Sequence, residues 1–312
     1  MIELGRDLCS DLAVSSRREW LVTNGIGGYA SGTVSGIPTR RYHGLLLAAL
    51  NPPLGRTLLV AKLEERAEYR GGLFRLGANR WASGAVDPRG FLLLDRFHME
   101  GTTPVWTYAL GDALVEKRGW MEPGANTTYV LYDLRRASGP VRLELAALVN
   151  HRDYHGNTHA DGWMMKVDTV PGGVRVTAFP GARPFFLLCE GAETFPTHDW
   201  YRDFFYSEEA YRGLDTVEDH LRAATFRATL SPGESLTLAF STEESPDMDG
   251  EAALERRRGY EERRVTQALP LWDTADPLWD RIRQLILASD QFIVRRTVAG
   301  DPEGKSVIAG YH

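Results

Sequence analysis

Alternating apolar and polar positions, broken by short turn sequences, dominate the chain from about residue 20 to residue 242. The segment RTLLVAKLEERAEYRGGLFRLG, for example, predicts two strands around a turn at residues 70–72. Strands joined by tight turns cannot be parallel, so the pattern predicts a mainly β fold, a large antiparallel assembly of two packed sheets. Such turns are predicted at Arg70-Gly71-Gly72, Gly111-Asp112, Ala137-Ser138-Gly139-Pro140, Pro171-Gly172-Gly173 and Ser231-Pro232-Gly233.

The pattern becomes helical near residue 246. The segment SPDMDGEAALERRRGYEERRV is charged, is rich in helix formers and has acidic residues in its first turn, so it predicts a linking helix. A second helix is predicted over residues 277–296, with Asp276 as N-cap and Pro277 at the first helical position. One amphipathic helix cannot bury its apolar stripe by itself. The stripe consists of Leu278, Ile282, Leu285, Ile286 and Ile293.

The glycine-rich stretch WLVTNGIGGYASG has the spacing of a dinucleotide-binding turn at Gly25, Gly27 and Ala30. That turn requires a following helix and an acidic residue about 20 positions later. The sequence that follows, SGTVSGIPTRRYHG, disfavours a helix, and residues 44–52 contain no Asp or Glu. We therefore expect a connection between strands and no nucleotide cofactor.

Composition and charge exclude several classes of function. The 312 residues are 43% hydrophobic and 25% charged, as in an ordinary globular protein. The net charge of −6 gives no electrostatic basis for binding nucleic acid or an anionic membrane. With two cysteines, Cys9 and Cys189, and an N-terminal MIELGRDLCS unlike a signal peptide, we expect a cytoplasmic protein.

Three histidines recur at four-residue intervals in NHRDYHGNTHADGW, namely His151, His155 and His159. On a helix they would share one face and could chelate a metal ion. Gly156 and Asn157 lie between them, however, just after a predicted strand. We therefore expect no metal at these residues.

Two polar clusters are candidates for hydrogen bonding to a polyhydroxylated ligand. They are Arg152, Asp153, Tyr154 and His155 in NHRDYHG, and Arg40, Arg41, Tyr42 and His43 in IPTRRYHG. Arginine offers a rigid fork of donors, tyrosine a ring with a polar tip, and histidine a donor or an acceptor. The alternatives are a solvated loop capped by its own Asp153 for the first cluster, and a basic edge that discourages aggregation of sheets for the second.

The segment HDWYRDFFYSEEAYRGLDTVEDH contains many carboxylates among aromatic residues. Glycoside hydrolysis needs two carboxyl groups, but no pair stands out here. We expect most of them to be solvated or paired with Arg202 and Arg212. They are Asp199, Asp203, Glu208, Glu209, Asp215, Glu218 and Asp219.

Four stretches together resemble the bacterial and archaeal type of glycogen debranching enzyme. They are EWLVTNGIGGYASGTVSGIPTRRYHGLLLAAL, NHRDYHG, WYRDFFYSEEAYRGLDTVED and the closing VIAGYH. The resemblance implies an N-terminal β supersandwich, followed by an (α/α)6 barrel of the glucoamylase kind that hydrolyses α-1,6-linked glucosyl stubs with two carboxyl groups in an inverting geometry. In that family AGYH precedes a Trp-Gly-Arg-Asp stretch and the barrel helices that supply the carboxyl groups. The resemblance therefore implies that this chain contains no catalytic residue and has little activity alone.

The resemblance also implies a division of the chain and a set of partners. Residues 1–245 would form the β-sandwich domain, 246–275 a linker helix region, and 276–312 the truncated start of the barrel domain. The expected partners are glycogen or a branched malto-oligosaccharide, and the barrel in the same or a separate chain. A homodimer through residues 277–296 is the other way to cover the apolar stripe.

The residues expected to contact glucan or to face the barrel come from these motifs. They are Asn24, Tyr29, Arg40, Arg41, Tyr42, His43, Arg152, Asp153, His155, Tyr201 and Arg212. Two other functions remain open, a free-standing carbohydrate-binding sandwich and a sandwich-type sugar epimerase that uses His43 or His155 with an acid from residues 199–219. The first predicts that no neighbouring gene encodes the barrel, and the second requires turnover by this chain alone.

Overall fold

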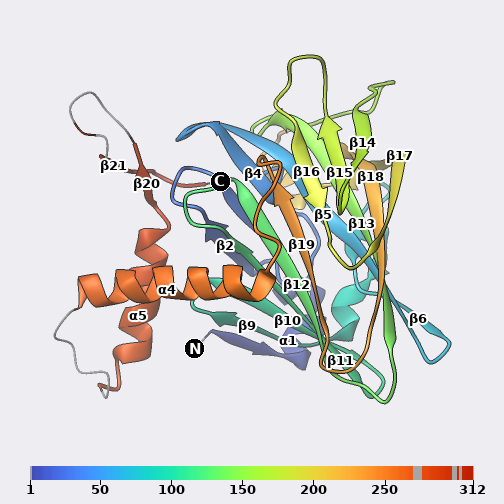
Figure 1. The fold of residues 1–312 in the computed structure, drawn as a ribbon, viewed down its shortest axis with the longest axis horizontal. Helices are drawn as coiled ribbons and strands as arrows, with labels where there is room; N and C mark the ends of the chain where they lie inside the picture. The colour runs from blue at the N-terminus through green and yellow to red at the C-terminus, as the bar shows by residue number, and fades with distance from the viewer. Residues whose placement is uncertain (1, 270–275, 297–300, 302–303, 312) are drawn as a thin grey trace.

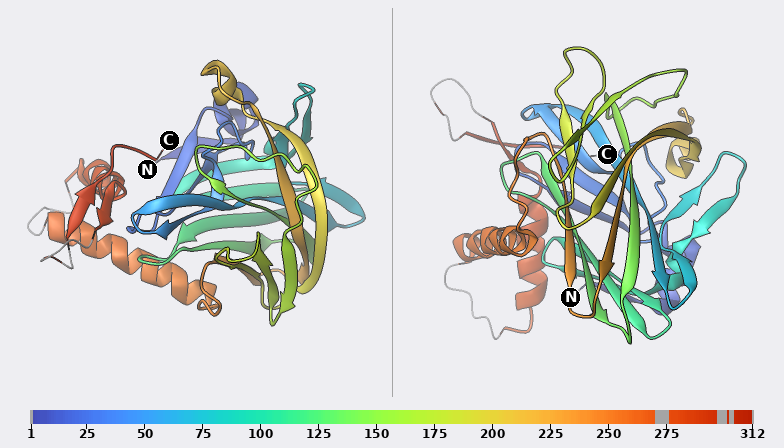
Figure 2. Two further views of the ribbon diagram at one scale, coloured as in Figure 1. Left: turned by 90° about the horizontal axis from the view of Figure 1, so that it is seen from above. Right: turned by 45° about the vertical axis from the view of Figure 1, so that its right-hand side comes forward.

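Two large antiparallel sheets packed face to face form the body of the protein (Figure 1, Figure 2). The computed structural model describes residues 2–269, 276–296, 301 and 304–311. One core cluster takes buried side chains from both sheets. The mainly β, antiparallel architecture predicted from the turns is confirmed.

Sheet A has nine strands in the spatial order β1-β9-β10-β11-β12-β19-β16-β15-β14. Their bounds are β1 Glu3–Gly5, β9 Leu94–Glu100, β10 Thr103–Leu110, β11 Ala113–Met121, β12 Thr127–Arg136, β14 Lys166–Val170, β15 Gly173–Thr177, β16 Phe185–Leu188 and β19 Ser235–Ser241.

Sheet B has eight strands, in the order β17-β18-β13-β5-β4-β3-β2 with β6 paired to β5. Their bounds are β2 Glu19–Thr23, β3 Tyr29–Thr33, β4 Gly44–Asn51, β5 Leu54–Tyr69, β6 Gly72–Arg75, β13 Val141–Asp153, β17 Glu193–Phe205 and β18 Val217–Leu230.

The remaining elements are two short ribbons and a few helices. The ribbons pair β7 Ala78–Arg80 with β8 Val86–Arg89, and β20 Ile293–Arg295 with β21 Lys305–Val307. The helices are α1 Arg6–Ser10, α2 Leu12–Ser15, the 3-10 helix η1 Gly90–Leu93, α3 Ser207–Tyr211, α4 Gly250–Ala268 and α5 Trp279–Asp290. Within the described residues, no helix has the length and apolar character needed to cross a membrane.

Strand periodicity gives sheet B a buried face and an outer face. In β13, Leu143, Leu145 and Ala147 are fully buried in the core between the sheets. Successive strand residues point to opposite sides, so Glu144 and Ala146 lie on the outer face, where both line a groove. That outer face carries the polar side chains considered below.

Three of the five predicted hairpin turns are confirmed, at residues 70–72, 111–112 and 171–173. The other two predictions are wrong, because β12 to β13 and β18 to β19 each cross from one sheet to the other. Both sides of β12 are already occupied by β11 and β19. The crossover at Ser138 is held by both sheets, since its N–H donates to Tyr69 Oη (3.0 Å) and Asp112 Oδ2 (3.1 Å).

The glycine-rich stretch of residues 24–28 joins the antiparallel strands β2 and β3, and no helix follows it. Gly27 has φ +100°, and a Cβ there would lie 2.6 Å from the carbonyl oxygen of Pro53. The glycine spacing therefore reflects a positive φ and a close backbone approach to the β4–β5 turn, within the connection between strands that the sequence predicts.

The second predicted helix is shorter than expected. Helix α5 begins at Trp279, while Asp276 instead caps the preceding turn by accepting from the N–H of Leu278 (2.7 Å). The chain leaves the helix after Asp290, and Ile293–Arg295 is a strand, so Ile293 does not belong to a helical stripe. Adjacent β-branched Ile and Val favour a strand, and pairing with β21 satisfies their backbone.

The apolar stripe predicted on this helix is also only partly buried. Leu287, which the pattern left out, is buried at 2% exposure, whereas Leu285 is 66% exposed. A spacing pattern identifies an apolar face but not the neighbour that covers it. His312 lies outside the described residues.

The predicted linking helix is confirmed as α4, and a buried ion pair attaches it to the sandwich. Arg257 Nε lies 3.0 Å from Glu261 Oε1, and both residues are 3% exposed. Arg257 also donates to the carbonyl oxygen of Thr23 (2.9 Å), and Glu261 accepts from the N–H of Thr102 (3.2 Å). These bonds connect α4 to the ends of both sheets, while the domain limits at residues 245 and 275 stay a prediction.

Breaking this pair should destabilise the whole sandwich. We expect Arg257→Ala to lower the free energy of unfolding by about 3–5 kcal/mol, because it leaves Glu261 buried and unpaired. Arg258→Ala, which removes a half-exposed arginine from the next position, should cost no more than about 1 kcal/mol. Urea denaturation followed by circular dichroism measures both, and equal effects would contradict a structural role for the pair.

Candidate functional site

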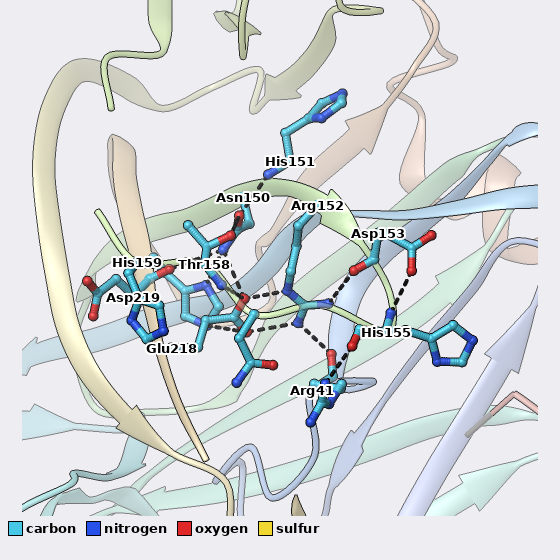
Figure 3. A network of polar contacts seen from close by, with 12 residues as sticks. Arg41, Asn150, His151, Arg152, Asp153, His155, Thr158, His159, Glu218 and Asp219 are labelled. Atoms are coloured by element: carbon cyan, nitrogen blue, oxygen red, sulfur yellow. Dashed lines mark hydrogen bonds and ion pairs between the residues drawn. The ribbon is translucent and has the colours of Figure 1, made fainter. Parts of the chain in front are cut away.

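A buried ion pair between Arg152 and Glu218 lies under one end of the outer face of sheet B (Figure 3). Arg152 is the penultimate residue of β13, and Glu218 is the second residue of β18. The guanidinium binds the carboxylate in a bidentate manner, with Nε on Oε1 and Nη2 2.8 Å from Oε2. Glu218 is fully buried and Arg152 is 8% exposed, so water does not screen this pair.

Both members of the pair are ionised. Burial by itself would raise the pKa of Glu218, but the charge of Arg152 and its hydrogen bonds hold that pKa below its usual value. Burial would lower the pKa of Arg152, yet Glu218 outweighs this effect and raises it. A buried charge of this kind is tolerated only when it is paired and hydrogen-bonded.

His220 extends the pair as a neutral imidazole. Burial lowers the pKa of His220 from 6.5 to about 4. The Asn150 amide nitrogen lies 3.1 Å from Nδ1, and because an amide NH2 can only donate, Nδ1 accepts and the proton resides on Nε2. Nε2 faces Tyr206 Oη at 3.1 Å, and Tyr206 in turn donates to Glu218.

A second buried pair holds the loop of residues 38–43 against the first. Arg152 Nη2 donates to the carbonyl oxygen of Arg41 (2.6 Å). Arg41 Nε lies 3.3 Å from Oε2 of the fully buried Glu209, and its Nη1 donates to the carbonyl oxygen of His155. Three loops, from residues 38–43, 154–160 and 206–217, are thereby fixed to one another.

These loops present a cluster of rings, which we call the aromatic cluster, formed by Tyr42, Tyr154 and His155. Tyr42 Oη lies 3.1 Å from His155 Nδ1, and the rings of Tyr154 and His155 are 3.9 Å apart. Arg212 lies 5.8 Å from the centre of the Tyr42 ring, and Arg56 lies 5.4 Å from that of Tyr154. His155 is exposed, and the buried ion pairs beneath it fix its position.

The structure brings six of the predicted site residues together here. They are Arg41, Tyr42, Arg152, Asp153, His155 and Arg212. Asp153 Oδ1 accepts from the backbone N–H of His155 (2.9 Å). The loop is therefore capped by its own aspartate, as the alternative interpretation of this cluster predicted.

The other predicted residues lie elsewhere. Arg40 and His43 both face Glu19, at 2.7 and 3.3 Å. Tyr29 is fully buried beneath Tyr311, with ring centres 4.9 Å apart.

Asn24 and Tyr201 are further from the aromatic cluster. Asn24 is buried in the β2–β3 turn, where its Oδ1 accepts from the N–H of Gly28 (2.9 Å). Tyr201 lies on β17 and lines a separate groove beside Arg222.

The three regularly spaced histidines point in different directions (Figure 3). His151 packs edge-on against Phe179 at 5.1 Å, His155 belongs to the aromatic cluster, and His159 faces Asp215 at 3.4 Å. Within the described ranges, no three His, Cys, Asp or Glu side chains are grouped so as to hold a metal ion.

Sequence reasoning missed the buried carboxylates. Glu209 and Glu218 are fully buried and pair with Arg41 and Arg152, so the expectation that such residues would be solvated or paired with Arg202 and Arg212 is wrong for Glu218 and incomplete for Glu209. Glu218 and His220 share the outer face of β18. In the sequence, charged outer positions that are buried look the same as charged outer positions that are exposed to water. Asn150, Tyr206 and Arg56 were also missed.

The neutral His220 makes stability depend on pH. Its pKa is about 4 in the fold against 6.5 when unfolded, so between these values the unfolded chain binds more protons and stability falls as the pH falls. We expect a loss of about 3 kcal/mol between pH 7 and pH 4 from this residue.

The variant His220→Gln isolates that contribution, because an amide keeps hydrogen-bonding capacity without titrating. Urea unfolding at several pH values should give a shallower decline for the variant than for the wild-type chain. Parallel declines would show that His220 does not remain neutral in the fold.

Comparisons with known proteins agree with the resemblance seen in the sequence. The family model described as "Glycogen debranching enzyme N terminal" matches residues 18–237. No curated protein sequence matches the chain.

Among solved structures, a protein titled "Putative kojibiose phosphorylase from human microbiome" matches with a TM-score of 0.32 and 9% identity, over 77% of this chain and 33% of that chain. A likeness of this degree does not establish a shared fold, and the chain spans only a third of that protein. The family match includes β2 to β18 with nearly every residue of the site, and the chain belongs to the family of glycogen debranching enzyme N-terminal domains.

Proposed function

We propose that this chain is the structural and substrate-orienting domain of a glycogen-debranching enzyme, and that it is inactive alone. The match to the family's N-terminal model over residues 18–237 is the observation that carries the proposal. The reaction would be hydrolysis of α-1,6 branch points by a catalytic (α/α)6 barrel, in the same polypeptide or a separate one. The proposed compartment is the cytoplasm.

The geometry of the aromatic cluster supports a glucan-contacting role. Tyr42 is buried, but Tyr154 is partly exposed and His155 is exposed, so these two rings can pack on a sugar ring and hydrogen-bond its hydroxyl groups. Because the loops are held by the buried pairs of Arg152 and Arg41, little ordering would be needed on binding.

The contacts of Tyr311 support the proposal that the barrel faces the same side of sheet B as the aromatic cluster. Tyr311 is buried against Tyr29, and its ring lies 4.9 Å from the Arg56 guanidinium. Arg56 therefore contacts both this segment and Tyr154 of the aromatic cluster. A domain that continues from this segment would begin beside the cluster.

Exposed apolar side chains on α5 and at its N-cap support a protein partner. Leu278 and Leu285 are 49% and 66% exposed. The barrel is the partner we propose for this surface, and a second copy of the chain is the alternative.

Removing the exposed ring of the aromatic cluster should weaken glucan binding. We expect His155→Ala to reduce the affinity for glycogen by roughly three- to tenfold, in line with the loss of one hydrogen-bonding partner. His159→Ala is the matched control, because it is exposed on the same loop but faces Asp215. Affinity electrophoresis in glycogen-containing gels measures both, and equal retardation of the two variants would contradict the glucan role of the cluster.

The chain alone should release no glucose from limit dextrin. The proposal places both catalytic carboxyl groups in the barrel, so incubation of the purified chain with limit dextrin should match a heat-inactivated control. Glucose release that is abolished by substituting an acid among residues 199–219 would contradict this and favour a complete enzyme.

A further inference from the structure

A second polar groove lies on the outer face of sheet B, away from the aromatic cluster. Its floor comes from β5, β13 and β18, one wall from the segment of residues 75–88, and the other from β17. Ala146 lines this groove and Arg152 underlies the cluster, so the two sites are about 20 Å apart along β13 at ~3.3 Å per residue. The side chains that matter are Glu64, Arg66, Trp81, Glu144, Tyr201 and Arg222.

Two aromatic rings form the walls of this groove. Trp81 is held in place by donating from Nε1 to the carbonyl oxygen of Asp87 (2.7 Å) and by packing on Phe204, with ring centres 4.7 Å apart. The N–H of Ala82 donates to the carbonyl oxygen of Asp203 (2.8 Å), so the segment that carries Trp81 is bonded directly to β17. Tyr201 comes from β17, with the Arg222 guanidinium 5.9 Å from its ring centre.

The groove is small and already shaped. Its cavity volume of about 160 Å³ is below the 300–1,000 Å³ typical of sites for drug-sized ligands, so it suits a single ring. Arg75 and Asp87 form a bidentate pair at 2.9 and 2.7 Å that braces the wall carrying Trp81. Such bracing lowers the ordering cost of binding.

The charges that line the groove cancel. Its three carboxylates, Glu64, Asp87 and Glu144, are matched by three guanidinium groups, Arg66, Arg75 and Arg222. The carboxylate of Glu65 turns to the core instead, where it lies 2.5 Å from Lys117 Nζ. A site with both donors and acceptors but no net charge favours a neutral polyhydroxylated ligand over an anion or a cation.

Arg222 supplies donors to the groove. Its Nη2 binds Asp199, and its side chain is 29% exposed and lines the groove. The accessible part of the guanidinium can donate to a ligand hydroxyl.

We propose that this groove is an accessory subsite that holds one glucosyl unit of an α-glucan between Trp81 and Tyr201. The choice of an α-glucan rests on the proposed function, whereas the rings, the balanced charge and the partly exposed guanidinium of Arg222 point to a sugar independently of it. The subsite would retain the polysaccharide at a distance from the aromatic cluster, so that one chain contacts glycogen at two places.

Calorimetric titration of the whole chain with maltoheptaose tests the subsite. Trp81→Ala and Tyr201→Ala should each weaken binding by roughly three- to tenfold, as expected for the loss of one ring contact. Phe179→Ala is the matched control, because Phe179 is an exposed ring, 48% accessible, that lies outside the groove. Arg222→Lys keeps the charge and removes the guanidinium that lines the groove, so it tests the site without removing a ring.

The outcomes separate this proposal from the previous one. The expected result is that Trp81→Ala and His155→Ala weaken binding independently and that the double variant shows the product of the two effects. If Trp81→Ala, Tyr201→Ala and Arg222→Lys all bind as the wild-type chain does while His155→Ala binds less, the subsite is wrong and the proposed function stands.

If His155→Ala has no effect while the groove variants weaken binding, the subsite stands and the aromatic cluster loses its proposed role. If the wild-type chain binds no maltoheptaose, both proposals fail. If Trp81→Ala proves unfolded by circular dichroism, Arg222→Lys and Tyr201→Ala decide the question.

Discussion

The bidentate ion pair between Arg152 and Glu218 is the constraint on which the candidate site depends. Both charges are removed from water, so each must find all of its partners inside the protein. The guanidinium finds them in Glu218 and in the carbonyl oxygens of Arg41 and Asp153. The carboxylate accepts in addition from Tyr206 and from the N–H of Thr158 (3.1 Å). Four separate segments of the chain are thereby fixed around one pair of charges.

Stability alone does not explain such a pair. Breaking a buried ion pair typically costs about 3–5 kcal/mol, yet replacing both partners by packed apolar side chains is often neutral or stabilising. What an apolar replacement could not supply is direction, because a bidentate pair fixes the angle between two strands and the loops bonded to them. The neutral His220 fits this interpretation, since its two nitrogens link Asn150 to Tyr206 without adding a third charge.

Local sequence signals predicted the elements well and their partners poorly. Periodicity and turn residues located the strands and α4, and glycine spacing gave the β2–β3 turn. The crossings at Ser138 and Pro232 were misread as hairpins, because a tight turn looks the same whether the next strand joins its own sheet or the facing one. Likewise Arg152 and His155 were recognised from a motif, whereas Glu218 was not, because its partner is 66 positions away in the sequence. Pairing across such a separation is decided by the register of β13 and β18, which no local pattern contains.

The outer face of sheet B explains why both proposed sugar contacts lie on the same surface. Along β13 and β18 the core-facing positions are apolar, while the outward positions run from Glu144 through Arg222 and His220 to Arg152. Arg152 and His220 are already buried, but partly exposed charged residues such as Glu144 and Arg222 would lose their hydration if an apolar neighbour covered this face. The charges are instead neutralised pairwise, by Glu144 with Arg227 at one end and Arg152 with Glu218 at the other. Such a face has little net field and many oriented donors and acceptors, which suits a neutral, heavily hydroxylated polymer better than a dry protein interface. Near Tyr29, Leu47 and Leu58, where Tyr311 packs, the outer face becomes apolar. The outer face therefore separates into an apolar part, which Tyr311 already covers, and a polar part, where both proposed glucan contacts lie.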